Sequence, residues 1–579
     1  MTKTIQRRQA APQQSLDLSQ WPKILQTVLA NRNVQNAKEL DYGLVSLEDP
    51  NRLKGIDEAV QLLEQALHGA WRILIVGDFD ADGATSCALA VTALKAMGAT
   101  YVEFLVPNRF DYGYGLTPEI VEVAASFEPE LIITVDNGIS SLEGVAAAHR
   151  LGIEVLITDH HLPGKALPEP AIIVNPNQPG CAFPSKNLAG VGVIFYVMVA
   201  LRGALRASGW FQDQNIAEPN MAEYLDLVAV GTVADVVPLD SNNRRLVYQG
   251  IQRIRHLKTR PGILAMLEVA GRQATRLSAS DLGFMVGPRL NAAGRLDDMS
   301  LGIRCLLSTD PMEAAELANQ LNDLNQDRRA IESSMQKEAL QTLQSLTFND
   351  DEAMPWGLCL YQAEWHQGVV GILASRIKDR YHRPVIAFAD ADSGNQIKGS
   401  ARSIAGLHIR DALDFVATQN PGLISKFGGH AMAAGLSIER ANFEDFSKAF
   451  DEAVRLQLSQ DDLTETLYTD GELNSSDFNL ELAQAIDAAG PWGQAFPEPL
   501  FDGEFHLLQQ RIVGQKHLKM VVAPASDSAC VLDAIAFSVD LDEWPNPSAQ
   551  KVHLVYQLQV NEYRGRQSVQ LVVRYFYAV

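Results

Sequence analysis

The chain has 579 residues, which is too long for a single hydrophobic core and predicts about three or four domains. Lysine and arginine total 48 against 70 aspartate and glutamate residues, giving a net charge of −22. This balance argues against non-specific coating of duplex nucleic acid, although a local basic channel can exist beneath an acidic exterior.

The cellular setting can be predicted from three further features. The five cysteines form no CxxC pair, which argues against a cysteine zinc site or a disulfide framework and fits a reducing compartment. No unbroken apolar segment is long enough to span a bilayer. The first residues are basic but no apolar region follows them, so we expect no secretory signal, a cytoplasmic location and no membrane contact.

The first half of the chain predicts an α/β domain. Residues 1–50 are polar and helix-prone, and we assign them no chemistry. In 51–308, short apolar segments alternate with helical ones, and Thr117-Pro118 and Ser140 with Glu143 supply helix-start signals. The expected strands are 72–76, 102–106, 131–135, 154–158 and 171–174. Continuously apolar strands alternating with helices predict a parallel sheet covered on both faces.

The second half predicts three further parts. Asp310-Pro311 begins a long helical pattern over 309–348, which is either a connector between domains or an ordinary bundle helix. A second α/β region follows at 349–462. Residues 463–579 contain alternating strand-like segments, which predict a small β-barrel or sandwich.

Acidic and histidine side chains stand where the expected strands end. Asp80 and Asp82 follow the first strand, Asp136 the third, and His160 with His161 the fourth. Further on, the apolar segment 225–230 leads into Asp235. Because ligands of such sheets bind beyond the carboxyl ends of the strands, these side chains should converge in one crevice. Asp78, also in the first loop, is better explained as a turn or cap residue.

A crevice of this composition favours divalent cations. Crowded carboxylates repel one another, and a bound cation removes that cost. Oxygen ligands with a few imidazoles suit Mn²⁺ or Mg²⁺, and two ions about 4 Å apart can clamp a phosphodiester and activate water. Each aspartate taken singly is explained about as well by a helix cap, but the set together is not.

The motifs resemble those of the DHH phosphoesterase superfamily. The matching segments are Asp80-x-Asp82-Gly, Val135-Asp136-Asn137-Gly138, Asp159-His160-His161 and Val233-Ala-Asp235-Val-Val-Pro. Residues 107–109, 112–115 and 288–295 are similar to segments of the RecJ family within it, and 365–371, 399–402 and 428–430 resemble the DHH-associated domain. The resemblance covers roughly residues 50 to 579.

The resemblance implies a fold and a metal site. The implied fold is a parallel-sheet DHH domain (51–308), a connecting helix, a DHH-associated α/β domain (349–462) and a C-terminal OB-like barrel (463–579). Two Mn²⁺ or Mg²⁺ ions would be held by Asp80, Asp82, Asp136, His160 and Asp235. His161 would complete the metal shell or polarise the attacking water. Diphosphatases of the superfamily carry an extra histidine where Val76 or Gly77 stands here, which disfavours pyrophosphatase chemistry.

The implied activity is 5′-to-3′ hydrolysis of single-stranded DNA in recombination, repair and mismatch repair. A single-strand-binding protein and a RecQ-type helicase are the implied partners, and we favour a monomer. The alternatives are a DHH phosphodiesterase acting on oligoribonucleotides or cyclic dinucleotides, and a DNA-binding scaffold without activity. The intact ligand set disfavours the scaffold.

Several residues are candidates for binding DNA or its phosphates. Arginines in glycine- or asparagine-rich motifs suit phosphate oxygens, although each could instead pair with one of the many acids. The RecJ resemblance implies that the DHH-associated domain holds the 5′ phosphate. The candidates are Arg109, Tyr114, Arg289, Asn291, Arg295, Ser400, Arg402 and His430.

Overall fold

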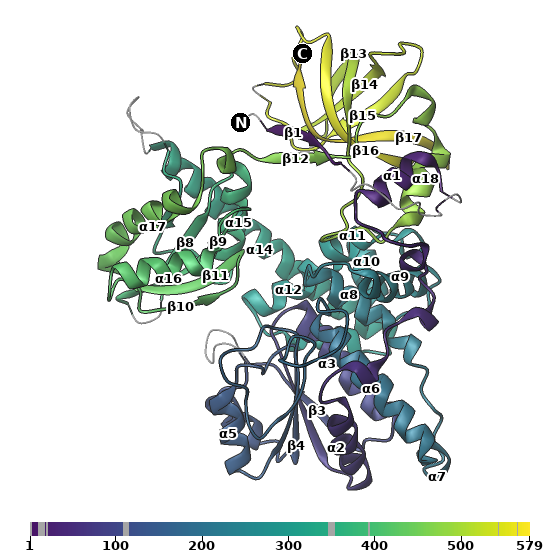
Figure 1. The fold of residues 1–579 in the computed structure, drawn as a ribbon, viewed down its shortest axis with the longest axis vertical. Coiled ribbons are helices and arrows are strands. Elements are labelled where there is room, and N and C mark those ends of the chain that lie inside the picture. Colours follow the sequence, from purple (N-terminus) through teal and green to yellow (C-terminus); the bar gives the residue numbers. More distant parts are fainter. Residues whose placement is uncertain are drawn as a thin grey trace. The chain divides into compact units, whose positions relative to one another are not determined.

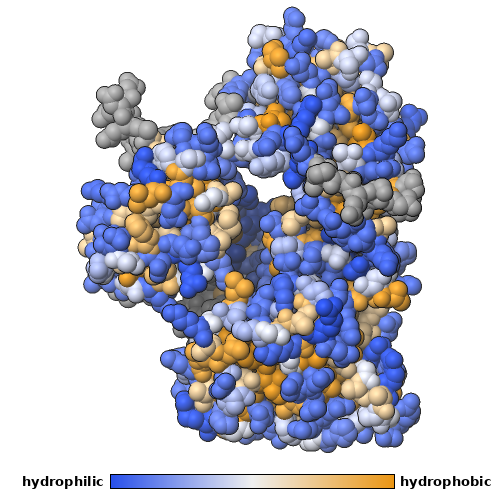
Figure 2. Space-filling view, viewed as in Figure 1, coloured by the Kyte–Doolittle hydropathy of each residue, from blue (hydrophilic) through white to orange (hydrophobic). Residues whose placement is uncertain are grey.

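The computed structural model describes residues 3–9, 18, 21–107, 115–345, 354–391, 394–541, 543–563 and 565–579. The chain divides into two compact units. One contains Asp323–Leu467 with the N-terminal Met1–Gln6, and the other contains Arg7–Asn322 with Tyr468–Val579 (Figure 1). The surface drawn in Figure 2 is largely hydrophilic, and the apolar residues on it gather in patches.

The first α/β domain contains the predicted parallel sheet. Its elements are α2 (Ile56–His68), β2 (Arg72–Gly77), α3 (Ala81–Ala96), β3 (Tyr101–Leu105), α4 (Pro118–Ala125), β4 (Leu131–Val135), α5 (Leu142–Arg150), β5 (Glu154–Thr158) and β6 (Ile172–Val174). The strand order is β3-β2-β4-β5-β6, and every pairing is parallel. Because β3 and β4 lie on opposite sides of β2, the topological switch point falls between β2 and β4, where such folds bind ligands.

Local sequence explains most of the helix starts. Thr117 caps α4 as expected, its hydroxyl accepting the Ile120 N–H. The capping box expected from Ser140 and Glu143 is wrong, because α5 begins at Leu142 with Ser141 as its N-cap. The Ser141 hydroxyl instead accepts the N–H of Leu116, which is a tertiary contact that periodicity does not reveal.

A helical layer follows the sheet. It contains α6 (Gly190–Ala207), α7 (Trp210–Asp213), α8 (Leu225–Ala234), α9 (Ser241–Arg255), α10 (Pro261–Val269), α11 (Ala279–Asp281), a π-helical turn (Leu282–Val286), α12 (Gly287–Leu296) and α13 (Ser300–Leu307). The apolar segment before Asp235 is therefore helix α8, so this carboxylate follows a helix end and not a strand end.

Helix α6 packs against α3 and α8 inside this domain. In the described part of the chain it is the one helix that is long and apolar enough to cross a membrane. Of that stretch, 61% is buried within the protein, and this packing accounts for its apolar composition.

The predicted long helix is α14 (Pro311–Ser345), which begins in one unit and continues into the other. The second α/β domain contains β7 (Leu358–Tyr361), α15 (Val370–Tyr381), β8 (Val385–Asp390), β9 (Gln396–Arg402), α16 (Ile409–Gln419), β10 (Lys426–Gly429), β11 (Ala433–Glu439) and α17 (Phe443–Gln457). Its sheet has the order β10-β11-β9-β8-β7, with β7 and β8 parallel and the other pairs antiparallel.

The predicted β-barrel is present and closed, in the order β13-β14-β15-β17-β16. After β12 (Thr466–Thr469) and α18 (Leu480–Ala489), its strands are β13 (Phe501–Val513), β14 (His517–Pro524), β15 (Leu532–Ala536), β16 (Lys551–Tyr563) and β17 (Arg566–Ala578). The barrel joins the first α/β domain through contacts that include the Leu239 N–H donating to the Gln494 carbonyl at 2.8 Å.

The N-terminal segment, to which we assigned no chemistry from the sequence, contacts both the barrel domain and the first α/β domain. It contains a strand, β1 (Thr4–Arg7), paired with β12, as well as helix α1 (Lys23–Ala30). Arg32 forms a fully buried ion pair with Asp470 on the barrel side, at 2.9 Å. Arg245 of α9 donates to the Asp41 carbonyl at 3.0 Å, so the same segment also contacts the first α/β domain.

Candidate metal centre

The switch point is held together by the loop after β4. The Asn137 side chain donates to the carbonyls of Val76 and Val135, at 3.1 and 2.9 Å, and so links the ends of β2 and β4. Asp136 has φ of +62°, a left-handed conformation that is uncommon for residues other than glycine. Its side chain is 2% exposed, so a buried carboxylate is held at the junction of two strands.

The loop after β2 brings further carboxylates. Asp80 is the N-cap of α3, with Oδ1 accepting the N–H groups of Asp82 and Gly83 at 2.9 and 3.0 Å. Asp78, which the sequence favoured as a turn residue, is buried beside it. Ligand oxygens of Asp78, Asp80 and Asp136 all lie within 4.8 Å of one another. The alternating aspartates at 78, 80 and 82 were the sequence signal for Asp78.

Asp82 lies in the first turn of α3, where it faces the helical layer, and it has no exposed surface. Its Oδ2 accepts the Gly190 N–H at 2.6 Å, and its Oδ1 accepts the Val191 N–H at 3.0 Å. Both donors belong to the first turn of α6. Ligand atoms of Asp82, His160 and Asp235 form a second group within 4.8 Å.

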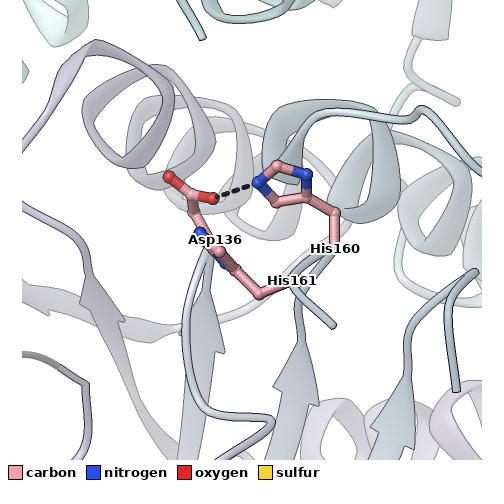
Figure 3. Close-up of side chains that lie close together, drawn as sticks. All are labelled: Asp136, His160 and His161. Carbon is pink, nitrogen blue, oxygen red and sulfur yellow. Dashed lines mark ion pairs between the residues drawn. The ribbon is translucent and has the colours of Figure 1, made fainter. Parts of the chain in front are cut away.

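The two histidines join these groups. Nε2 of His160 lies 3.1 Å from Oδ1 of Asp136 and 3.5 Å from Oδ2 of Asp235. Figure 3 shows the His160 ring directed at the Asp136 carboxylate. His161 forms a third group with Asp136 and His160. Asp136 and His160 each belong to two of the three groups, and together the groups contain every residue that the sequence predicted for the metal site.

The electrostatics of the cluster fit a cation site. Burial, and then the charge of Asp80, raises the pKa of Asp82 to about 7. Burial and the neighbouring Asp82 raise the pKa of Asp136 and of Asp235 well above the usual range for a carboxyl group. Hard carboxylate oxygens with two imidazoles form a donor set that suits Mn²⁺ or Mg²⁺. The residues present thus match the metal ions that the sequence predicted.

Helix α12 supports the loop after β2. Oδ1 of Asn291 accepts the Ala81 N–H at 2.8 Å. A Cβ at Gly294 would collide with the Phe79 carbonyl, so only glycine allows this close approach. Arg289 is buried and donates to the Met285 carbonyl and to Asn322, at 2.7 and 2.9 Å. These contacts favour structural roles for Asn291 and Arg289, while Arg295 of the same helix is half-buried.

The DNA-binding candidates of the second α/β domain lie at strand ends of its sheet. Arg402 donates through Nη1 to Ser400 Oγ at 3.1 Å and to the Ala401 carbonyl at 2.8 Å. A Cβ at Gly371, in the first turn of α15, would lie 2.9 Å from both Arg402 Nη2 and Ser400 Oγ. His430 is exposed and follows β10. A hydroxyl and a guanidinium therefore meet at a helix N-terminus, an arrangement that suits anions.

Arg109 and Tyr114 lie outside the described residues. Trp365, which begins one of the segments that resemble the DHH-associated domain, is buried, and its indole N–H donates to Glu338 at 3.0 Å. It is a core residue.

Comparisons with known proteins agree with this arrangement. Three family profiles match: the DHH family N-terminal domain at residues 72–232, the DHHA1 domain at 357–456 and the RecJ OB domain at 469–575. The single-stranded-DNA-specific exonuclease RecJ of Dickeya dadantii is 57% identical over 556 residues, covering 96% of each chain. Its namesake from Escherichia coli is 54% identical over 574 residues, covering 99% of each chain. The crystal structure of Thermus thermophilus RecJ with Mn²⁺ matches at a TM-score of 0.79 and 28% identity, covering 100% of this chain and 80% of that one.

A DHH sheet with clustered carboxylates and imidazoles, followed by a DHHA1 domain, defines a metal-dependent phosphoesterase of the DHH class. The closed C-terminal barrel, which matches the RecJ OB domain, distinguishes one family within this class of phosphoesterases. The chain belongs to the RecJ family of single-stranded-DNA-specific exonucleases.

Proposed function

We propose that this protein degrades single-stranded DNA from its 5′ end, using two Mn²⁺ or Mg²⁺ ions at the switch point of the DHH sheet. The observation that carries the proposal is the convergence of three overlapping groups of carboxylates and imidazoles from separate segments of the chain. When bound, two divalent ions there supply electrostatic stabilisation of the phosphodiester and acidify a water molecule.

The protein's own residues hold and orient the reacting groups. Asp136 and His160, which belong to more than one ligand group, are the candidates to connect two ions. Asp78, Asp80, Asp82 and Asp235 supply the remaining carboxylates. Oδ1 of Asp159 contacts Nδ1 of His161 at 2.8 Å and fixes the orientation of that ring. No serine or cysteine nucleophile is required.

Ser400, Arg402 and His430 are the candidates to bind the 5′ phosphate of the strand. A forked guanidinium beside a hydroxyl and a helix N-terminus suits a terminal phosphate, and this contact would give the enzyme its polarity. The barrel is the candidate single-strand platform, because OB folds combine cationic residues with stacking surfaces. On this barrel Arg511 and Lys519 are cross-strand neighbours.

We assign the cellular setting by family membership. The protein would act in the cytoplasm, in recombination, repair and mismatch repair, beside a single-strand-binding protein and a RecQ-type helicase. The domain limits that we propose remain 1–50, 51–308, 309–348, 349–462 and 463–579.

The test is digestion of end-labelled single-stranded DNA with Mn²⁺, with either the 5′ or the 3′ end blocked by a bulky adduct. We expect a 5′ block to prevent digestion and a 3′ block to leave it unchanged. The reverse result would refute the polarity. Faster cleavage of an oligoribonucleotide or a cyclic dinucleotide than of a long DNA strand would instead favour the alternative DHH phosphodiesterase activity.

A further inference from the structure

The first turn of α6 lies between two carboxylates of the candidate metal centre. Its Gly190 and Val191 N–H groups donate to Oδ2 and Oδ1 of Asp82, at 2.6 and 3.0 Å. The first N–H groups of a helix have no partner within the helix, and they carry the positive end of its dipole. Asp82 is fully buried, so these two donors fix both of its oxygen atoms in one orientation.

Gly190 also touches the other carboxylate. A Cβ at this position would lie 2.6 Å from Cβ and 2.7 Å from Oδ1 of Asp136. Such distances are too short for real side chains, and Asp136 cannot yield easily because it has a left-handed backbone conformation directly after β4. The single hydrogen of Gly190 therefore sets how closely Asp136 approaches α6, while its amide sets where Asp82 points.

Asp82 is enclosed from a second side. A Cβ at Gly231 of α8 would lie 2.7 Å from Oδ1 of Asp82 and would collide with Thr85 Oγ1. Asp235 follows one turn later, at the end of the same helix. The α6 start, the α8 backbone and the start of α3 thus meet around one carboxylate, and a glycine allows the close approach of each of the first two, Gly190 in α6 and Gly231 in α8.

We propose that the α6 N-terminus is a positioning element of the metal centre, in which Gly190 and Val191 orient Asp82 and Gly190 fixes its spacing from Asp136. A carboxylate has about four lone-pair positions, so Asp82 can accept both N–H groups and still offer an oxygen to a cation. Asp82 and Asp136 are then held in position before a cation binds. The free energy needed to order the two ligands is therefore supplied by folding and not by metal binding.

Sequence alone would not separate Gly190 from the other glycines of α6. Gly192 is two residues later, where a Cβ would meet only the flexible end of Leu188 at 3.0 Å. Gly203 lies on the same helix, where a Cβ would meet nothing within 4 Å. Gly203→Ala is therefore a matched control, because it makes the same chemical change in the same helix away from the carboxylates.

The experiment measures Mn²⁺ binding to the full-length, metal-free protein by electron paramagnetic resonance, without DNA. We expect Gly190→Ala to weaken Mn²⁺ binding by about tenfold or more, as disrupting a residue that orients a ligand commonly does. Gly203→Ala should bind as the wild type does. Circular dichroism and thermal melting of the metal-free variants check that each is folded. Wild-type affinity in folded Gly190→Ala would overturn the proposal.

A second pair of variants isolates the hydrogen bond. Val191→Pro and Val191→Ala both remove the isopropyl group, but only proline removes the N–H that reaches Asp82, at a first-turn position where proline is tolerated. We expect Mn²⁺ binding to be several-fold weaker in the proline variant than in the alanine variant. Equal affinities would count against the proposal. Loss of folding in both Gly190→Ala and Val191→Pro would also count against the proposal. In that case the two amides would be needed for the protein to fold, and not specifically for metal binding.

This inference rests on the proposed metal-dependent function, and the two can fail separately. If the wild-type protein binds no Mn²⁺, the proposed function fails. If the wild type binds Mn²⁺ and Gly190→Ala binds it equally well, only the role of α6 is refuted.

Discussion

Nδ1 of His161 lies 2.8 Å from Oδ1 of Asp159, whose side chain is 1% exposed. Burial is the largest single influence and disfavours charge on both groups. The hydrogen bond between them, the attraction of their charges and further neighbouring contacts together outweigh it, so the pKa of Asp159 is lowered and that of His161 is raised. Oδ1 of Asp159 also accepts the N–H groups of His160 and His161, and Oδ2 accepts that of Ile139. One buried carboxylate thus holds the backbone and the ring of the His-His pair.

Replacing this carboxylate should therefore disturb the metal site without removing a ligand. In Asp159→Asn the amide NH₂ must face an N–H donor, which loosens the loop and the ring of His161. We expect Mn²⁺ affinity to fall by roughly 10–100-fold, the usual cost of losing a partner that orients a histidine ligand. Calorimetric titration of the metal-free protein measures this fall, and unchanged affinity would remove Asp159 from the site.

Asp136→Asn should separate activity from stability. Asparagine tolerates the left-handed conformation of residue 136, whereas alanine would be strained there. We expect nuclease activity to fall by more than about 100-fold, because a ligand shared by two groups is lost. The free energy of unfolding of the metal-free protein at about pH 8 should rise by on the order of 1–2 kcal/mol, because repulsion with Asp82 is removed.

Urea denaturation in the presence of a chelator measures that stability. Asp414→Asn, which makes the same chemical change at an exposed position of α16, is a control for the general effect of removing a negative charge. An active Asp136→Asn enzyme would contradict the site assignment.

The metal-free protein should lose stability as the pH rises. The pKa of Asp82 is raised to about 7, so between about pH 4 and pH 7 the folded protein binds this proton more tightly than the unfolded chain does. The corresponding stabilisation is present below the unfolded pKa and is lost as the pH rises through about 7. Mn²⁺ added at about pH 8 should restore stability, because it binds the ionised carboxylates of the folded state.

Melting curves at about pH 5.5 and pH 8, with chelator or with Mn²⁺, test this dependence. The difference between the two pH values should shrink in Asp136→Asn. A metal-free protein that is more stable at the higher pH would show that the pKa values of the clustered carboxyl groups are not raised by folding.

Asn291 should affect turnover more than DNA binding. Its Oδ1 accepts the Ala81 N–H, next to Asp80, so Asn291→Ala releases the loop that carries two ligand candidates. We expect kcat to fall by about tenfold with KM for DNA nearly unchanged, because the residue holds the site and not the strand. Arg295→Gln is the comparison: loss of a phosphate contact should raise KM and reduce the salt dependence. A raised KM in Asn291→Ala would instead assign it to DNA.

Arg402→Lys should weaken the distinction between DNA ends. Lysine keeps the charge but loses the planar guanidinium, whose Nη1 donates to Ser400 Oγ and to the Ala401 carbonyl and whose fork of donors matches a phosphate. We expect the preference for a 5′-phosphorylated strand over a 5′-hydroxyl strand to fall by about tenfold, or 1.4 kcal/mol. Lys448→Gln, which removes an exposed cation from helix α17 of the same unit, should leave the preference unchanged. An undiminished preference in Arg402→Lys would place the 5′ phosphate elsewhere.

The sequence by itself determined the strands of the first parallel sheet and most of the metal-site candidates. Local signals sufficed there, because a strand buried on both faces must be continuously apolar and parallel strands present their carboxyl ends at one edge. Asp80, Asp136 and His160 could therefore be placed together before any contact was known. The barrel followed from alternation in the same way, although β15 did not stand out, because its sequence Leu-Asp-Ala-Ile-Ala contains a single β-branched residue.

Only the tertiary structure decided the rest. Asp78 is a ligand candidate because it lies close to Asp136, which belongs to another loop. Asn291 supports the loop after β2, and Arg289 has a structural role, because each contacts a distant segment of the chain. The apolar segment before Asp235 proved to be helix, because a helix buried on all sides has no more periodicity than a buried strand. The role of Gly190 depends on the absence of a methyl group between two carboxylates. A sequence pattern does not show which glycine is required for such a close approach.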